Sequence, residues 1–160
     1  MSLSQKIAAA LDDLANTIAP PRTVTAEEGP HRIDLPVGLA TSIGIECAGF
    51  GFHVADRSGL SLDDLRGWGD RLAKKVTYLM EPLAVHEADA LGHEVVLRSA
   101  TPTAKPDRRS YYEARLKGSG DMTFERVAFD EESRNRRPVP CHFTNEVVDR
   151  LVDDLVATAP

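Results

Sequence analysis

The first regular apolar pattern along the chain has the spacing of a helix. Its apolar residues recur at intervals of four, three and four, at Ile7, Leu11, Leu14 and Ile18. Pro20 and Pro21 follow, and proline lacks the amide donor that a continuing helix needs. We therefore expect a helix that starts near Ser4 and ends before the prolines. Its narrow seam fits packing on the domain's own sheet, but the same spacing also fits a coiled coil with a second subunit.

Two later segments have the helical period and carry start signals. Ser61 and Asp64 have nearly the spacing of a capping box, Leu60 and Leu65 form a hydrophobic staple, and Glu81-Pro82 ends the segment. The apolar stripe of this second helix consists of Leu62, Leu65, Trp68, Leu72, Val76, Leu79 and Met80. Thr144 marks the start of a last helix, because a threonine hydroxyl can accept a bond from a free amide there. The buried face of that helix consists of Val147, Val148, Leu151, Val152, Leu155 and Val156.

Residues 23–54 alternate apolar and polar side chains, as strands do. Ile33 and Leu35 alternate with polar neighbours, and the same pattern continues from Ile43 to Cys47, which predicts two or three strands. The apolar phase then moves by one residue on the way to Phe50, Phe52 and Val54. We expect a bulge or a turn at Gly49, and the sequence leaves both open.

Two hairpins are predicted after the second helix. Residues 83–99 form one around a turn at 89–92, and Gly118-Ser119-Gly120 is the turn of the next. Val127 and Phe129 have the opposite phase to Met122 and Phe124, which predicts a bulge near Glu125-Arg126. We read residues 130–137 as a charged loop.

The elements are grouped rather than strictly alternating, which favours an antiparallel α+β fold over a doubly wound sheet. We predict three helices beside a mainly antiparallel sheet of about five to seven strands, in the order helix, two or three strands, helix, four strands, helix. A chain of 160 residues suits a single domain over residues 1–160. Met1-Ser2-Leu3 is typical of an expression-vector remnant, so it receives no role.

Composition and charge narrow the classes of function. The formal charge of -6 disfavours nonspecific binding to nucleic acid or anionic membrane, since both partners have the same sign. No apolar run approaches the roughly 20 residues of a membrane span, and Asp12 and Asp13 make the first segment unlike a signal peptide. Cys47 and Cys141 lie far apart without C-x-x-C spacing, which supports neither a disulfide framework nor a zinc site. We expect a soluble cytoplasmic protein with reduced cysteines.

One candidate site is the hairpin that contains His86, Glu87 and His93, because imidazoles and carboxylates bind metals and transfer protons. If Ala88 pairs with His93, the two histidines share one face and Glu87 points to the other. Such a split leaves no compact ligand set, so we predict no metal site and read the histidines as solvated or structurally bonded.

A second candidate site is basic. The loops before Tyr111 and after Phe129 should be neighbours, because the start and end of a hairpin lie at the same end. That would gather six cations, Lys105, Arg108, Arg109, Arg134, Arg136 and Arg137. Four acidic residues accompany them, Asp107, Asp130, Glu131 and Glu132. The group is either a solvated, salt-bridged edge or a site for an anion or an acidic partner.

A third candidate is a pocket between the second helix and the sheet. Its lining would be three tyrosines, one acid and one base, namely Tyr78, Tyr111, Tyr112, Glu81 and Arg98. Tyrosines at sheet edges also serve simply as packing area with a hydroxyl in water, which is the alternative.

The sequence contains no G-x-G-x-x-G, Walker loop, G-x-S-x-G elbow or H-E-x-x-H motif, so we expect no cofactor and favour a nonenzymatic role. Small size, acidity and helices beside a sheet resemble many binding modules and small secretion-type chaperones, in fold alone. We expect a noncatalytic binding or assembly module whose partner is a second copy or another protein. The alternative is a small enzyme or ligand-binding protein that uses His53, His86 or His93 with nearby carboxylates.

Overall fold

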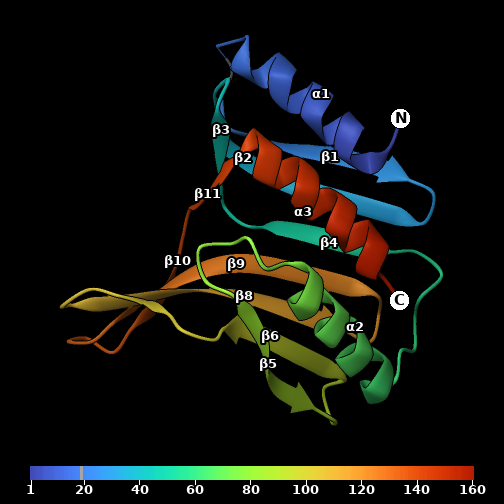
Figure 1. Cartoon of the computed structure of the whole chain (residues 1–160), viewed down its shortest axis with the longest axis vertical. Coiled ribbons are helices and arrows are strands. Elements are labelled where there is room, and N and C mark those ends of the chain that lie inside the picture. Colours follow the sequence, from blue (N-terminus) through green and yellow to red (C-terminus); the bar gives the residue numbers. More distant parts are fainter. Residues whose placement is uncertain (19) are drawn as a thin grey trace.

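Three helices pack on one face of a large antiparallel sheet, as Figure 1 shows. The structure is a computed structural model that describes residues 1–18 and 20–160. The helices are α1 (Leu3–Ala15), α2 (Leu62–Lys75) and α3 (Asn145–Thr158). Helices α1 and α3 lie beside each other near the N-terminal strands, and α2 covers the strands that follow it. We call the other side of the sheet the helix-free face.

Each helix begins at a hydroxyl cap. Ser61 and Asp64 form the capping box of α2, and Thr144 caps α3, as their sequence signals predicted. Ser2 caps α1, and the Leu3 side chain is only 1% exposed, so both residues belong to the fold although the sequence assigned them no role. The α1 seam packs on β1, β2 and α3, which confirms the intramolecular interpretation for Ile7, Leu11 and Leu14. Ile18 lies beyond the helix and is fully exposed.

The described residues form eleven strands in one sheet, more than the five to seven expected. The first four are β1 (Arg22–Glu28), β2 (His31–Ala40), β3 (Gly44–Cys47) and β4 (Phe50–Val54). Between α2 and the second hairpin lie β5 (Leu83–Asp89), β6 (Glu94–Ser99) and β7 (Thr103–Ala104). The last four are β8 (Arg108–Lys117), β9 (Asp121–Asp130), β10 (Arg136–Val139) and β11 (Cys141–Thr144). Every pairing between them is antiparallel.

The sheet forks at Gly49, where the sequence predicted a bulge or a turn. Strands β3 and β4 both pair with β2, and the Ala48 amide between them donates to the Pro36 carbonyl at 3.1 Å. Gly49 has a φ of 80°, a conformation that glycine adopts without strain. Beyond it β4 pairs with β9, whereas β3 pairs with β11. Strand β10 pairs with β9, so β10 and β11 fill the fork.

Strands β10 and β11 were missed in the sequence. Part of the predicted charged loop at 130–137 is β10, which begins at Arg136 and pairs with β9 from Phe129 to Arg126. Its residues are two arginines, a proline and a valine, so it has no alternating apolar pattern. Main-chain hydrogen bonding does not depend on such a pattern, and the strand forms because the fork offers it free edges.

The predicted bulge near Glu125-Arg126 is wrong. Strand β9 pairs with β8 in one unbroken register, from Arg108 opposite Asp130 to Leu116 opposite Met122. Val127 and Phe129 therefore point to the helix-free face, and Arg126 points under the helices. There Arg126 Nη1 lies 3.1 Å from Oε1 of the buried Glu81. The apolar phase changes because a buried ion pair occupies a core position.

The two cysteines face each other in the core. Cys47 of β3 and Cys141 of β11 are directly opposite in the ladder, and both are buried, free thiols. The hydrogen bond to Cys47, together with burial, raises the pKa of the Cys141 thiol. None of the helices among the described residues is both long and apolar enough to cross a membrane.

Candidate functional site

A buried carboxylate on the helix-free face organises the site. Glu113 of β8 is 1% exposed, between two core residues that point the other way, Tyr112 and Ala114. Its Oε2 accepts from Arg98 Nε at 2.7 Å and from Arg136 Nη2 at 2.9 Å. Its Oε1 accepts from Arg115 Nη2 at 2.7 Å. Three strands, β6, β8 and β10, thus bring three guanidinium groups to one carboxylate.

The charges of this cluster do not cancel. Burial by itself would raise the pKa of Glu113, but hydrogen bonds from Arg98 and Arg115 outweigh it and hold the pKa below its usual value. Arg115 also pairs with Glu94, so the cluster contains three guanidinium groups and two carboxylates. By these ion pairs it has one more guanidinium group than carboxylate, and Glu125 stands opposite Glu113 in the β8–β9 ladder.

Beside this cluster lies a cavity of about 420 Å³, which we call the arginine pocket. It is lined by His86, Arg98, Ser99, Ala100, Pro102, Arg109, Tyr111, Phe129 and Arg136. The guanidinium carbons of Arg98 and Arg136 lie 5.5 and 5.8 Å from the centre of the Tyr111 ring. That of Arg109 lies 5.5 Å from the Phe129 ring centre. Among the described residues that line it, none is a carboxylate, so the wall is cationic and aromatic.

His86 completes one side of the arginine pocket. The register of β5 against β6 shifts between Val85 and Glu87, and this bulge turns His86 toward Arg98. Arg98 Nη1 lies 3.1 Å from His86 Nε2, and because a guanidinium only donates, Nε2 is the acceptor. The neutral ring then carries its proton on Nδ1.

The predicted hairpin register is wrong, and the hairpin does not gather its titratable groups. Ala88 pairs with Val95 rather than with His93, which lies in the turn with a φ of 47°. Glu87 pairs with Val96 and is exposed. Within residues 1–18 and 20–160, no three His, Cys, Asp or Glu side chains are placed to hold a metal ion.

His53 belongs to a different cluster. Its Nδ1 lies 2.6 Å from Asp121 Oδ1, and the Ser119 hydroxyl donates to Oδ2 of the same aspartate at 2.7 Å. Burial raises the pKa of Asp121, whereas the hydrogen bonds from Ser119 and His53 lower it. The net effect is a pKa below the usual value. The aspartate lies between the serine and the histidine, so the imidazole does not activate the hydroxyl.

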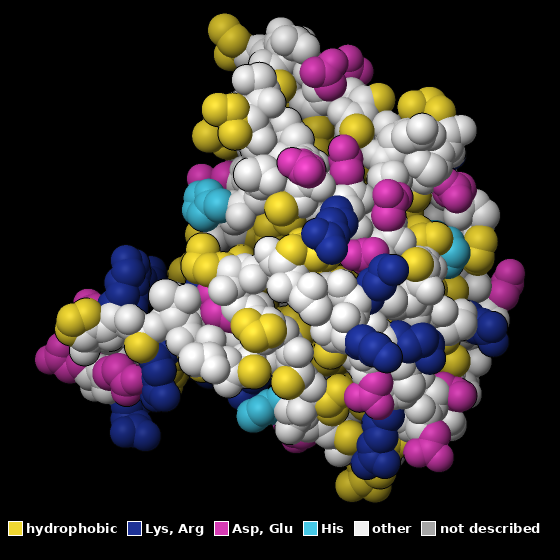
Figure 2. Space-filling model, viewed as in Figure 1, with side chains coloured by type: hydrophobic (Ala, Val, Ile, Leu, Met, Phe, Trp, Pro, Cys, Tyr) yellow, Lys and Arg dark blue, Asp and Glu magenta, His cyan; other side chains and the backbone are white. Residues whose placement is uncertain are grey.

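The basic loops are neighbours, as the hairpin predicted. Arg108 stands opposite Asp130, and the Glu131 amide donates to the Asp107 carbonyl at 3.0 Å. The ends of β8, β9 and β10 project past the helices as an arm on the left of Figures 1 and 2, which carries both dark blue and magenta side chains. Four of the six cations lie in paired strands, where the ladder puts Arg109 and Arg136 on one face and Arg108 and Arg137 on the other, and Lys105 and Arg134 lie in the turns. Arg109 and Arg136 line the arginine pocket, whereas Lys105, Arg108, Arg134 and Arg137 do not.

The predicted tyrosine pocket does not form, because its members lie on both sides of the sheet. Tyr112 packs in the core with the Arg126 guanidinium 4.4 Å from its ring centre, and Arg126 pairs with Glu81. Tyr78 donates to Asp154 of α3 at 2.7 Å, and burial followed by that bond raises the pKa of Tyr78. Tyr111 and Arg98 line the arginine pocket instead. Glu113 and Phe129 were not predicted as site residues. In the sequence, charged and aromatic residues alternate with core positions along these strands. A strand with one face in water shows the same pattern, so the pattern did not identify the site.

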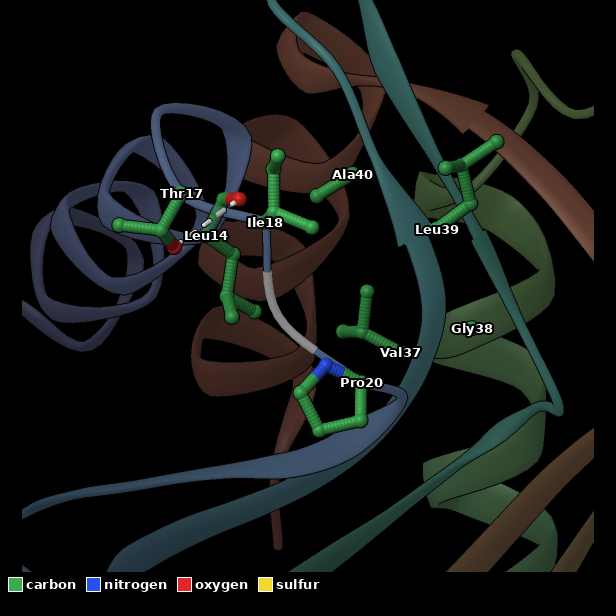
Figure 3. Close-up of a pocket in the computed structure, with 8 residues that line it drawn as sticks. All are labelled: Leu14, Thr17, Ile18, Pro20, Val37, Gly38, Leu39 and Ala40. Atoms are coloured by element: carbon green, nitrogen blue, oxygen red, sulfur yellow. Dashed lines mark hydrogen bonds between the residues drawn. The ribbon is translucent and has the colours of Figure 1, made fainter.

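A second hollow lies where α1 ends over β2, and Figure 3 shows its lining. Its volume is about 200 Å³. The lining is uncharged and consists of Leu14, Thr17, Ile18, Pro20, Val37, Gly38, Leu39 and Ala40. Without a titratable or charged side chain among those residues, this hollow offers apolar contact and no acid-base chemistry.

The chain was compared with protein-family models, with curated proteins and with solved structures, and none of them matches it. A function must therefore be inferred from its own residues. The arginine pocket is the place where those residues are most specifically arranged.

Proposed function

We propose that this protein is a noncatalytic binding module that holds an anionic group, a carboxylate or a phosphate, in the arginine pocket. One observation carries the proposal: three guanidinium groups line one cavity, and no carboxylate lines it among the described residues. Guanidinium forks match carboxylate and phosphate oxygens geometrically, and such charge-assisted bonds are stronger than neutral ones.

The arginines are held in place before any ligand arrives. Glu113 binds Arg98 and Arg136 from beneath, and both guanidinium groups also lie over the Tyr111 ring. Each arginine has donors left over, because a guanidinium carries five N–H groups. Little side-chain freedom is then lost on binding, which is the advantage of preorganisation.

The wall also predicts what accompanies the anion. Tyr111, Phe129, Ala100 and Pro102 give the arginine pocket an apolar and aromatic side. An anion attached to a flat apolar group should therefore bind better than a bare one. An aromatic carboxylate is the simplest probe with both properties.

Chemistry on the ligand has less support. The Ser99 hydroxyl donates to Glu81 at 3.1 Å and accepts from the Tyr112 amide at 2.8 Å, so it is not a free nucleophile. His53 and His93 do not line the arginine pocket, and His86 contacts a cation rather than a carboxylate. Acid–base catalysis by His86 would need a partner that orients the ring and can accept its proton. Arg98 contacts the ring but cannot accept a proton, because a guanidinium does not act as a base.

The test is a titration with benzoate, acetate and inorganic phosphate, in which NMR monitors the side-chain Nε–H signals of the arginines. Wild type should bind benzoate more tightly than acetate. Arg136→Gln removes one charge-assisted contact worth about 1.5 kcal/mol, so benzoate affinity should fall about tenfold.

The matched control is Arg137→Gln. Arg137 is the next residue of β10, is exposed, and does not line the arginine pocket, so its loss removes the same charge without touching the site. Equal weakening by the two changes would show only general charge attraction and would refute the proposal. So would the absence of any shift in Arg98 and Arg136 signals.

A further inference from the structure

Strand β1 is an outer strand, and on its outer side a side chain of α1, Lys6, reaches the Glu27 carbonyl. Among the described strands it pairs with β2 alone, in an unbroken register from Arg22 opposite Val37 to Glu28 opposite His31. Thr23 stands opposite Pro36, which has no amide, so this pair is not the hydrogen-bonded kind. By alternation the amides and carbonyls of Thr23, Thr25 and Glu27 point away from β2. Lys6 Nζ, 2.6 Å from the Glu27 carbonyl, confirms the direction.

Strand β5, which ends the sheet on the opposite side, is protected in a way that β1 is not. A shift of register between Val85 and Glu87 bends β5, and bulges of this kind hinder pairing with another chain. Strand β1 contains no bulge and no proline. Its three outward residues, Thr23, Thr25 and Glu27, are all exposed.

We infer that β1 pairs with β1 of a second copy of this chain, antiparallel, about a two-fold axis at Thr25. In that register Thr25 faces Thr25, Thr23 faces Glu27, and Arg22 faces Glu28 of the other copy. The outward groups then meet outward groups, so each of the three free amides donates to a carbonyl across the axis. The Glu27 carbonyl can accept this bond beside Lys6, because a carbonyl oxygen has two lone pairs.

The charges at the ends of β1 favour a second copy over an unrelated strand. The Arg22 side chain is exposed and has no ion pair or side-chain hydrogen bond with any described residue. Glu28, at the other end of the strand, is partly exposed and likewise makes no ion pair with any described residue. The symmetric register places Arg22 of each copy opposite Glu28 of the other, which gives two such pairs in the dimer. Registers shifted by one residue per chain do not form these pairs.

The pairing leaves the arginine pocket open. The pocket is built on β5, β6, β8, β9 and β10, and along the sheet β6 and β5 lie at the end opposite to β1 and β2. A dimer formed through β1 would be one continuous sheet across both copies.

Sedimentation velocity on the full chain tests this pairing. Wild type should show a dimer that dissociates on dilution. Arg22→Glu and Glu28→Arg should each weaken it at least tenfold, because each places like charges across the axis twice. An equal mixture of these two variants should restore the dimer, since every mixed pair again joins opposite charges.

A backbone variant provides an independent arm. Thr25→Pro removes the amide at the axis, which β2 does not use, whereas Thr25→Ala keeps it and loses only the bond to Asp34. Only the proline variant should be monomeric, with unchanged circular dichroism. If Thr25→Pro does not fold, the mixing experiment decides. A monomeric wild type, a dimer indifferent to all these changes, or a monomer that binds an extended peptide of another protein along β1 would each overturn the inference.

Discussion

Glu113→Gln tests whether the buried carboxylate holds the helix-free face together. The change preserves the size of the side chain and removes the charge that three guanidinium groups share. Arg98 and Arg136 then lose the carboxylate that pairs with them, and Arg115 keeps only Glu94. We expect the folded state to lose stability and the arginine pocket to lose its shape.

The size of the effect follows from burial. Breaking a buried ion pair by removing one partner costs about 3–5 kcal/mol. Glu113 is 1% exposed, but the arginine side chains are 26%, 38% and 44% exposed, so water partly replaces the lost contact. We therefore expect the low end, about 3 kcal/mol in the free energy of unfolding. For a chain of this size that lowers the melting temperature by about 6–12 °C.

Urea unfolding monitored by Trp68 fluorescence measures the loss, since this tryptophan lies on the buried face of α2 and is fully buried. Glu131→Gln is the matched control, because its ion pair with Arg109 is about half exposed on both sides. The control should cost less than about 1 kcal/mol. A loss for Glu113→Gln no larger than that of the control would refute the reasoning.

The pH dependence gives a second readout of Glu113. Its pKa is lower in the folded state than in the unfolded chain, so its stabilising contribution is fully present above the unfolded value of about 4.3. The contribution is lost as pH falls through the lower folded value. The stability difference between wild type and Glu113→Gln should accordingly be constant near neutral pH and shrink below about pH 4.

Two further predictions concern the fork of the sheet. Gly49→Ala should destabilise by more than about 3 kcal/mol, because strain at positive φ adds to a Cβ placed 2.2 Å from the Phe124 carbonyl oxygen. Gly59→Ala, at a φ of 73° with nothing within 4 Å, should cost only about 1 kcal/mol, and equal costs in urea unfolding would contradict the steric argument. Cys47 and Cys141 should resist alkylation by iodoacetamide at pH 8 until urea unfolds the chain, because both are buried and hydrogen bonding with burial raises the pKa of Cys141. Rapid labelling of the native protein, measured by mass spectrometry, would contradict that expectation.

Local signals in the sequence predicted the elements that local interactions form. The helix caps Ser61 and Thr144 and the hairpin turn at residues 118–120 all depend on residues within a few positions of one another. The α+β class and the antiparallel sheet followed from the grouping of those elements. Errors arose where a residue's partner lies far away in the chain. The charged residue Arg126 at a core position suggested a bulge, because its ion-pair partner, Glu81, stands 45 positions earlier and could not be recognised from the sequence.

By itself, the sequence determined where the helices begin, which strands form hairpins and the neighbouring positions of the two basic loops, because periodicity and turn chemistry act over short distances. It placed the end of the second helix at Glu81-Pro82, whereas α2 ends at Lys75. Only the tertiary structure decided the fork at Gly49 and the insertion of β10 and β11, since main-chain pairing needs no particular side chains. It also decided the candidate site. Glu113 meets Arg98 and Arg136 across separations of 15 and 23 residues, and those distances close only when the strands align. In the sequence, a charged residue on the second face of a strand looks the same whether water or three arginines cover it.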